Sequence, residues 1–228
     1  MVKVDDVFIG GDEGPRIVGV IFERGHAQRA ISDGADILEF RADLARDVEG
    51  VLDDIDKVDV PIILTDRIVE EGGNAPINRA EHVLPLLQYA AIIDIELMAP
   101  DRDVVMAEVS TKGLPTLISY HDLDGTPPEA TMLERMRAAN RMGDMVKLAV
   151  TIEHLQDVPR VLAVSLAARE EGMTFCVVPM GKLGSHLRPL MGTYGSSLLY
   201  GYVGKPISPG MLSVAQMKRA FGEVHSWR

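Results

Sequence analysis

Short runs of apolar and β-branched residues recur along the chain, and longer stretches with apolar residues at helical spacing separate them. This alternation is typical of repeated βα units that build a parallel sheet. The apolar runs predict eight strands, at 16–22, 37–41, 61–65, 91–96, 115–120, 145–149, 173–179 and 198–201.

The helical stretches are clearest at 131–140 and 155–170, and a further one at 214–221 closes the series. Eight units with no low-complexity linker predict an α/β fold, a (β/α)8 barrel of the TIM type, as a single domain over residues 1–228. Residues 1–14 form an N-terminal extension, and the sequence leaves open whether it covers the barrel bottom as a short strand or stays loose.

The composition of the chain limits the classes of partner and function that it can have. Hydrophobic residues make up 46% of the chain and charged residues 25%, which suits a globular core. The formal net charge of −11, without a Lys/Arg cluster, disfavours nucleic acid and anionic membranes as partners. Apolar runs stay far below the roughly 20 residues of a membrane span, and the N-terminus lacks an apolar leader. We therefore expect a cytoplasmic protein that binds a small molecule.

Metal chemistry is not expected. The single cysteine, Cys176, lies in an apolar run, which excludes an internal disulfide and a cysteine-rich metal site and predicts a buried thiol. No His-x-x-x-His or His-Glu-x-x-His spacing is present in the sequence.

Ionisable residues collect where the predicted strands end. They stand at 39–43, 65–67, 94–96, 119–122 and 147. The carboxyl ends of parallel barrel strands meet at one face, where such enzymes carry their active sites. This pattern predicts a polar pocket for a small, oxygen-rich ligand.

Lys147 stands inside an otherwise apolar strand with no acid beside it in the sequence. Desolvation and nearby cationic side chains lower the pKa of a lysine, and a neutral amine can attack a carbonyl carbon, so we expect a Schiff-base nucleophile. The alternative is a lysine paired to Glu39 or Glu96 across the barrel. His121 follows an apolar run and is a candidate acid–base group, against the alternative of a surface histidine.

Two arginines are candidate anchors for anionic or hydroxyl groups, because a guanidinium offers a rigid fork of donors. They are Arg67 and Arg188, and either reads equally as a surface arginine. Glycine-rich stretches at 180–185 and 192–197 flank a short predicted helix, where barrels often bind phosphate; loop packing explains them as well.

Taken in order, several short motifs resemble the type I 3-dehydroquinate dehydratase family. The matching segments are Glu39-Phe40-Arg41-Ala42-Asp43, Arg67 followed by Glu71-Gly72-Gly73, Asp94-Ile95-Glu96, Ser119-Tyr120-His121-Asp122, Lys147, Met180-Gly181 through Arg188, Gly195-Ser196 and Ser208-Pro209-Gly210. The resemblance covers strands two to eight. It implies a lyase of the shikimate pathway that converts 3-dehydroquinate to 3-dehydroshikimate by syn dehydration, without metal or organic cofactor, as a homodimer.

The resemblance also implies roles for individual residues. Lys147 bonds the C3 ketone, His121 moves the protons and Glu71 orients His121. The substrate-binding residues are Glu39, Arg41, Arg67, Arg188 and Met211. The acids Asp43, Asp94 and Glu96 are expected to support the site without contacting the substrate.

The last loop departs from the family pattern. Ile207 and Met211 stand where the family usually carries Ser and Gln, and Leu187 replaces a common Ser. Loss of these polar contacts predicts weaker substrate binding, with a rise in KM larger than any fall in kcat. Ser208 or Ser213 are candidates to replace the lost contacts.

Two other functions fit the residues. One is a Schiff-base aldolase or transaldolase that acts on a sugar phosphate held by the glycine-rich stretches. The other is a non-catalytic barrel that binds a polyhydroxy acid.

Overall fold

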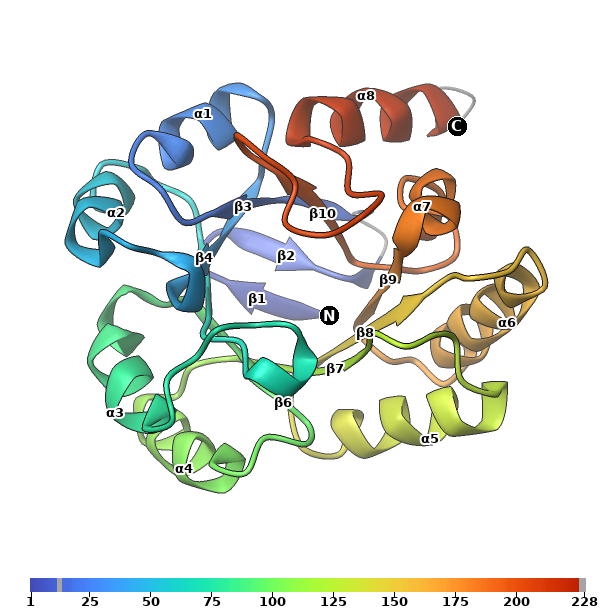
Figure 1. Ribbon diagram of the computed structural model, residues 1–228, viewed down its shortest axis with the longest axis horizontal. Coiled ribbons are helices and arrows are strands. Elements are labelled where there is room, and N and C mark those ends of the chain that lie inside the picture. The colour runs from blue at the N-terminus through green and yellow to red at the C-terminus, as the bar shows by residue number, and fades with distance from the viewer. Residues whose placement is uncertain (12–13, 226–228) are drawn as a thin grey trace.

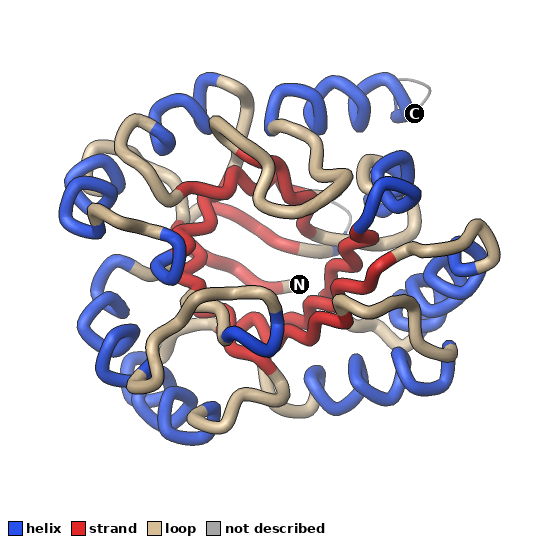
Figure 2. The backbone as a smooth tube through the Cα atoms, viewed as in Figure 1, coloured by secondary structure: helices blue, strands red, loops and turns tan. Residues whose placement is uncertain are grey.

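The computed structural model describes residues 1–11 and 14–225. Eight parallel strands form one sheet that curls into a barrel, and helices surround it (Figures 1 and 2). The barrel strands are β3 (Arg16–Ile21), β4 (Ile37–Arg41), β5 (Ile62–Thr65), β6 (Ile92–Glu96), β7 (Thr116–Asp122), β8 (Met145–Thr151), β9 (Phe175–Met180) and β10 (Leu198–Tyr202). Each overlaps one predicted strand, which confirms the (β/α)8 prediction.

The helices return the chain from one strand to the next along the outside of the barrel (Figure 1). They are α1 (His26–Ser32), α2 (Val48–Ile55), α3 (Arg79–Val83), α4 (Arg102–Lys112), α5 (Glu129–Asn140), α6 (Asp157–Glu170), α7 (Gly181–Gly184) and α8 (Val214–His225). Local signals set several ends. Asp47 caps α2 by accepting the Gly50 N–H at 3.0 Å, and Gly113, with φ +64°, ends α4.

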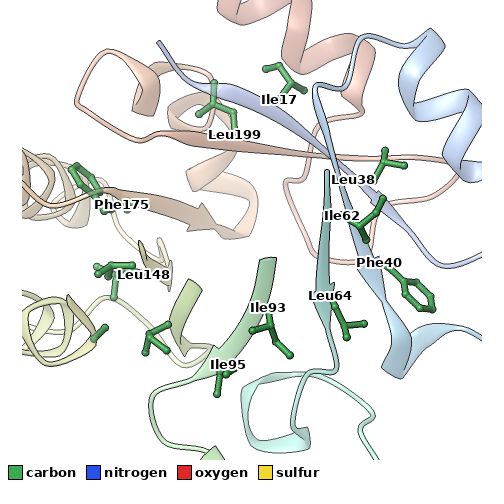
Figure 3. Close-up of a cluster of buried hydrophobic side chains, with 14 of the residues drawn as sticks. Ile17, Leu38, Phe40, Ile62, Leu64, Ile93, Ile95, Leu148, Phe175 and Leu199 are labelled. Atoms are coloured by element: carbon green, nitrogen blue, oxygen red, sulfur yellow. The ribbon is translucent and has the colours of Figure 1, made fainter. Parts of the chain in front are cut away.

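Two apolar layers hold the barrel, because alternate strand residues point outward and inward. The outward layer packs between the strands and the helices and includes Ile93, Leu148 and Phe175 (Figure 3). The inward layer fills the lower half of the barrel and includes Ile37 and Leu117. Burial on both faces is why these strands read as continuous apolar runs.

The described part of the N-terminal extension forms a hairpin of β1 (Val2–Val4) and β2 (Val7–Ile9), paired antiparallel. Val4 and Ile9 belong to the inward apolar layer together with Val18. In Figure 1 the hairpin crosses the opening of the strand ring. It therefore covers the amino-terminal end of the barrel.

The ring has one seam. Strand order runs β10-β3-β4-β5-β6-β7-β8-β9, and within the described ranges no ladder joins β9 to β10. Two bonds bridge the seam near its lower end, from the Ser197 N–H to the Phe175 carbonyl (2.7 Å) and from the Val177 N–H to Ser196 Oγ (2.9 Å). The backbone N–H and C=O groups of the odd-numbered residues of β9 point toward the seam. The next odd-numbered residue after Val177 is Pro179, which carries no N–H.

Candidate active site

A cavity of about 360 Å³ opens at the carboxyl ends of the strands. All eight residues assigned from sequence to catalysis or substrate binding line it, namely Glu39, Arg41, Arg67, Glu71, His121, Lys147, Arg188 and Met211. The structure therefore brings together side chains from three barrel strands and three loops in one place.

Lys147 lies on β8 and is 6% exposed. Its Nζ donates to Glu39 Oε1 at 3.0 Å and to Asp94 Oδ2 at 3.1 Å. Burial alone lowers the pKa of Lys147, but the two carboxylates outweigh burial and hold the pKa above its ordinary 10.5. The expectation of a lowered pKa was therefore wrong, and the alternative pairing with Glu39 is present, whereas Glu96 pairs with Arg67 and Arg79.

Asp94 has a larger part in the site than the sequence indicated. Its Oδ2 accepts from both Lys147 and Arg67 (2.6 Å), and its Oδ1 accepts from Ser119 Oγ (2.6 Å). Sequence reasoning placed Asp94 among the supporting acids. Its contact with the nucleophile was missed because the contact spans 53 residues of chain.

Tyr200 was also missed. Its ring lies on β10, with the Lys147 Nζ 4.2 Å from the ring centroid. The only sequence signal was a tyrosine inside the apolar run that begins at Leu198.

His121 and Glu71 form a close pair. Glu71 Oε2 accepts the backbone N–H of His121 at 3.1 Å and lies 2.7 Å from His121 Nδ1. Because this oxygen already accepts one N–H, we assign the ring proton to Nδ1, which leaves Nε2 as the free basic nitrogen. Burial, with the charges of Arg67 and Lys147, lowers the pKa of His121 well below its ordinary value, so the imidazole is neutral at pH 7.

Glu71 is buried as well. Burial raises the pKa of Glu71 to about 8, and the nearby acids Glu96 and Asp94 act in the same direction. Its second oxygen, Oε1, has no hydrogen-bond partner among the described residues. Glu71 therefore orients His121 through two contacts of one carboxyl oxygen.

Most of the other polar side chains near the mouth of the cavity form hydrogen bonds and ion pairs with one another. Arg41 makes a two-bond pair with Asp43 (2.8 and 2.7 Å). Arg67 contacts Ser119 (2.6 Å), Asp94 and Glu96 (3.1 Å), so its orientation is fixed before any ligand binds.

Arg188 differs from the other arginines. It is 3% exposed, and among the described residues its side chain makes a single long hydrogen bond, of 3.4 Å to Ser208 Oγ. Within the part of the chain that the structure describes, it has no acidic partner and its Nε has no acceptor. Burial lowers the pKa of Arg188 to about 10. A buried, unpaired guanidinium facing the cavity suits an anionic ligand.

The last loop lies over the cavity. Ile207, Ser208, Pro209 and Met211 line it. Gly210, with φ +76°, lies so close to the Gly181 carbonyl that a Cβ would stand 2.1 Å from the oxygen, so glycine is required there. The two apolar departures thus face the site directly, whereas Leu187 is buried in the outward apolar layer.

The two glycine-rich stretches lie apart. Gly181 lines the cavity, but residues 192–197 precede β10 and lie at the opposite end of the barrel, beside Met1 and Gly10. The alternative in which the two stretches together hold one phosphate is therefore wrong, because they lie at opposite ends of the barrel.

The described residues include neither a metal-binding cluster nor a membrane-spanning helix. No group of three or more His, Cys, Asp or Glu side chains there is arranged to hold a metal ion. None of the helices described is long and apolar enough to cross a membrane. Cys176 is free and buried, as predicted.

Comparison with known proteins points to one family. The family model described as type I 3-dehydroquinase matches residues 23–226. The 3-dehydroquinate dehydratase of Methanothrix thermoacetophila is 39% identical over 199 residues, which cover 85% of this chain and 84% of that protein. That of Methanocella arvoryzae is 35% identical over 208 residues, covering 89% and 94%. The crystal structure of 3-dehydroquinate dehydratase from Geobacillus kaustophilus has a TM-score of 0.88 at 27% identity, covering 99% of this chain and 96% of that one.

Proposed function

Because the chain belongs to the type I 3-dehydroquinase family, we propose that it dehydrates 3-dehydroquinate to 3-dehydroshikimate through a Schiff base on Lys147. The observation that carries the mechanism is the placement of a buried lysine and a neutral histidine in one cavity. The nucleophile and the base thus reach the same bound molecule.

The first step is activation of the amine. Between Glu39 and Asp94, Lys147 is an ammonium, so it must give up a proton before it attacks. Asp94 is already held by Arg67 and Ser119, whereas Glu39 accepts only from Lys147 and the Thr65 hydroxyl (3.1 Å) in the described contacts. Glu39 is therefore the better proton acceptor.

Bond formation follows. The free electron pair of Lys147 Nζ adds to the C3 carbonyl carbon, and the carbonyl oxygen leaves as water after taking up two protons. The product is a cationic iminium, which draws electrons from the adjacent C2–H bond.

His121 then transfers the protons. Its Nε2 takes the C2 proton, and the C–H electrons form an enamine. The enamine expels the C1 hydroxyl, which leaves as water with the proton from His121. Water hydrolyses the resulting imine, releases 3-dehydroshikimate and restores the Lys147 amine.

Binding contacts orient the ring for these steps. Arg188 meets the substrate carboxylate, because its guanidinium is buried without an acidic partner. Glu39, Arg41 and Arg67 are assigned to the ring hydroxyls. Met211 contributes an apolar contact at the loop, in place of a hydrogen bond.

Borohydride reduction tests the Schiff base. Intact mass is measured after incubation with 3-dehydroquinate and borohydride, for the native chain and for Lys147→Ala. We expect an adduct of substrate or product size on the native chain and none on the variant. Binding of 3-dehydroquinate without any adduct would overturn the assignment of Lys147.

Two further expectations remain proposals. We propose a homodimer, which light scattering coupled to size-exclusion chromatography tests. We also propose a cytoplasmic location, and cell fractionation with antibody detection tests it.

A further inference from the structure

Tyr200 holds its ring against the amine of Lys147, a contact that the proposed mechanism does not use. Nζ lies 4.2 Å from the ring centroid, and the two side chains are 6% and 5% exposed. The ring also lines the cavity. A cation within about 6 Å of an aromatic face is attracted by the ring quadrupole, most strongly where water is excluded.

The Lys147 nitrogen is contacted from three strands. Glu39 on β4 and Asp94 on β6 each accept one N–H, while Tyr200 on β10 presents its ring. The carboxylates hold the nitrogen through directional hydrogen bonds. The ring acts on the charge alone and requires no N–H.

This difference matters once the imine forms. An ammonium carries three N–H bonds, but a cationic iminium carries one, so at most one of the two carboxylates keeps its hydrogen bond. The positive charge persists until the C2 proton leaves. The attraction between ring and cation therefore survives a step in which a carboxylate contact is lost.

We propose that Tyr200 is a positioning residue whose ring face stabilises the cationic iminium on Lys147 during dehydration. This inference rests on the proposed function. The hydroxyl of Tyr200 is buried with no hydrogen-bond partner among the residues described, so the structure gives the ring, and not the hydroxyl, the contact with the nitrogen. Burial raises the pKa of Tyr200 well above 10, which keeps the phenol neutral beside the two acids.

The expected effects separate the ring from the hydroxyl. Tyr200→Phe keeps the ring, and we expect its kcat to stay within about threefold of the native value. Tyr200→Leu removes the ring, and we expect kcat to fall about 10- to 30-fold, the range for a cation–π contact in a desolvated site. KM should change much less than kcat, because the iminium that the ring stabilises forms only after the substrate has bound.

A fluorination series tests the electrostatic part without changing the packing. Phenylalanine, 3,5-difluorophenylalanine and pentafluorophenylalanine are placed at position 200 by nonsense suppression, and each step weakens the negative face of a ring of nearly constant shape. Urea unfolding checks that every variant folds. We expect log kcat to fall stepwise along the series.

The outcomes are distinct. A flat series would overturn the role of the ring, even if Tyr200→Leu fails to fold. An equal loss of kcat in Tyr200→Phe and in a folded Tyr200→Leu would also overturn it. The native chain is assayed in parallel by turnover and by borohydride adduct. Absence of both from the native chain refutes the proposed function itself, whereas a normal native result with a flat series refutes only the role of Tyr200.

Discussion

Replacement of Arg188 by methionine should raise the free energy of unfolding and, at the same time, raise the KM for the substrate. The guanidinium is buried without an acidic partner, and burial lowers its pKa from the ordinary arginine value to about 10. At about 1.4 kcal/mol per pKa unit, this difference costs the folded state roughly 3 kcal/mol. A base with a lowered folded pKa carries that cost in full below about pH 10, loses it progressively as the pH rises from there to the ordinary arginine pKa, and carries none above it.

Methionine removes the charge and keeps most of the apolar stem. The variant gives up only the long bond to Ser208, so we expect a gain of about 1–3 kcal/mol in the free energy of unfolding at pH 7. A hydrogen bond to a charged group contributes about 1.5–3 kcal/mol, so loss of the carboxylate contact should raise KM by roughly 10- to 150-fold.

Urea unfolding and steady-state kinetics with 3-dehydroquinate measure the two effects on one preparation. Arg188→Lys is the matched control: it keeps a buried charge, gains no stability, and loses the two-pronged geometry of the guanidinium. A methionine variant that is less stable than the native chain, with KM unchanged, would contradict this reasoning. It would show that Arg188 is stabilised by a partner within the protein and does not bind the substrate.

Three further predictions concern the base and the loop. His121 must be neutral to accept the C2 proton, and its pKa is lowered. As the pH is lowered, kcat/KM should therefore stay level down to pH 6.5 and fall only below it. A fall centred above pH 7 would contradict this assignment. Glu71→Gln keeps an oxygen that accepts the His121 N–H bonds, so it should retain most of kcat, whereas Glu71→Ala should lose about 10- to 100-fold; equal losses would mean that the charge of Glu71, and not its orientation of His121, is needed. The double change Ile207→Ser and Met211→Gln restores polar groups that face the cavity, so KM should fall by roughly 5- to 10-fold with kcat little changed. Titration calorimetry with the product should show tighter binding. An unchanged KM would mean that Ser208 already supplies the contact.

The strands and the face of the barrel that carries the site were predictable from sequence. Burial on both faces makes each strand an apolar run, and a charged residue interrupts such a run only where it reaches the mouth. Lys147 stood out for this reason. The family was predictable too, because the order of several weak motifs is more specific than any one of them, and the comparisons confirm it.

The electrostatic state of the site was predictable only in part, because the sequence named Glu39 as an alternative partner of Lys147 but did not indicate Asp94. Lys147 has no acid beside it in the sequence, yet Glu39, 108 residues away, and Asp94 neutralise it. Which acid meets the lysine depends on the stagger between strands, and the sequence of one strand does not encode that stagger. The same reason hid the contact with Tyr200, which crosses the seam of the barrel.

That seam has a consequence for association between chains. An open pair of strand edges is a template on which another polypeptide can add a strand, and such additions lead to aggregates. Here Pro179 stands on the open edge of β9 and offers no N–H to an incoming strand, while the Val177 N–H is already taken by Ser196. The edge of β9 therefore stays partly unpaired without offering a second molecule a run of free N–H groups.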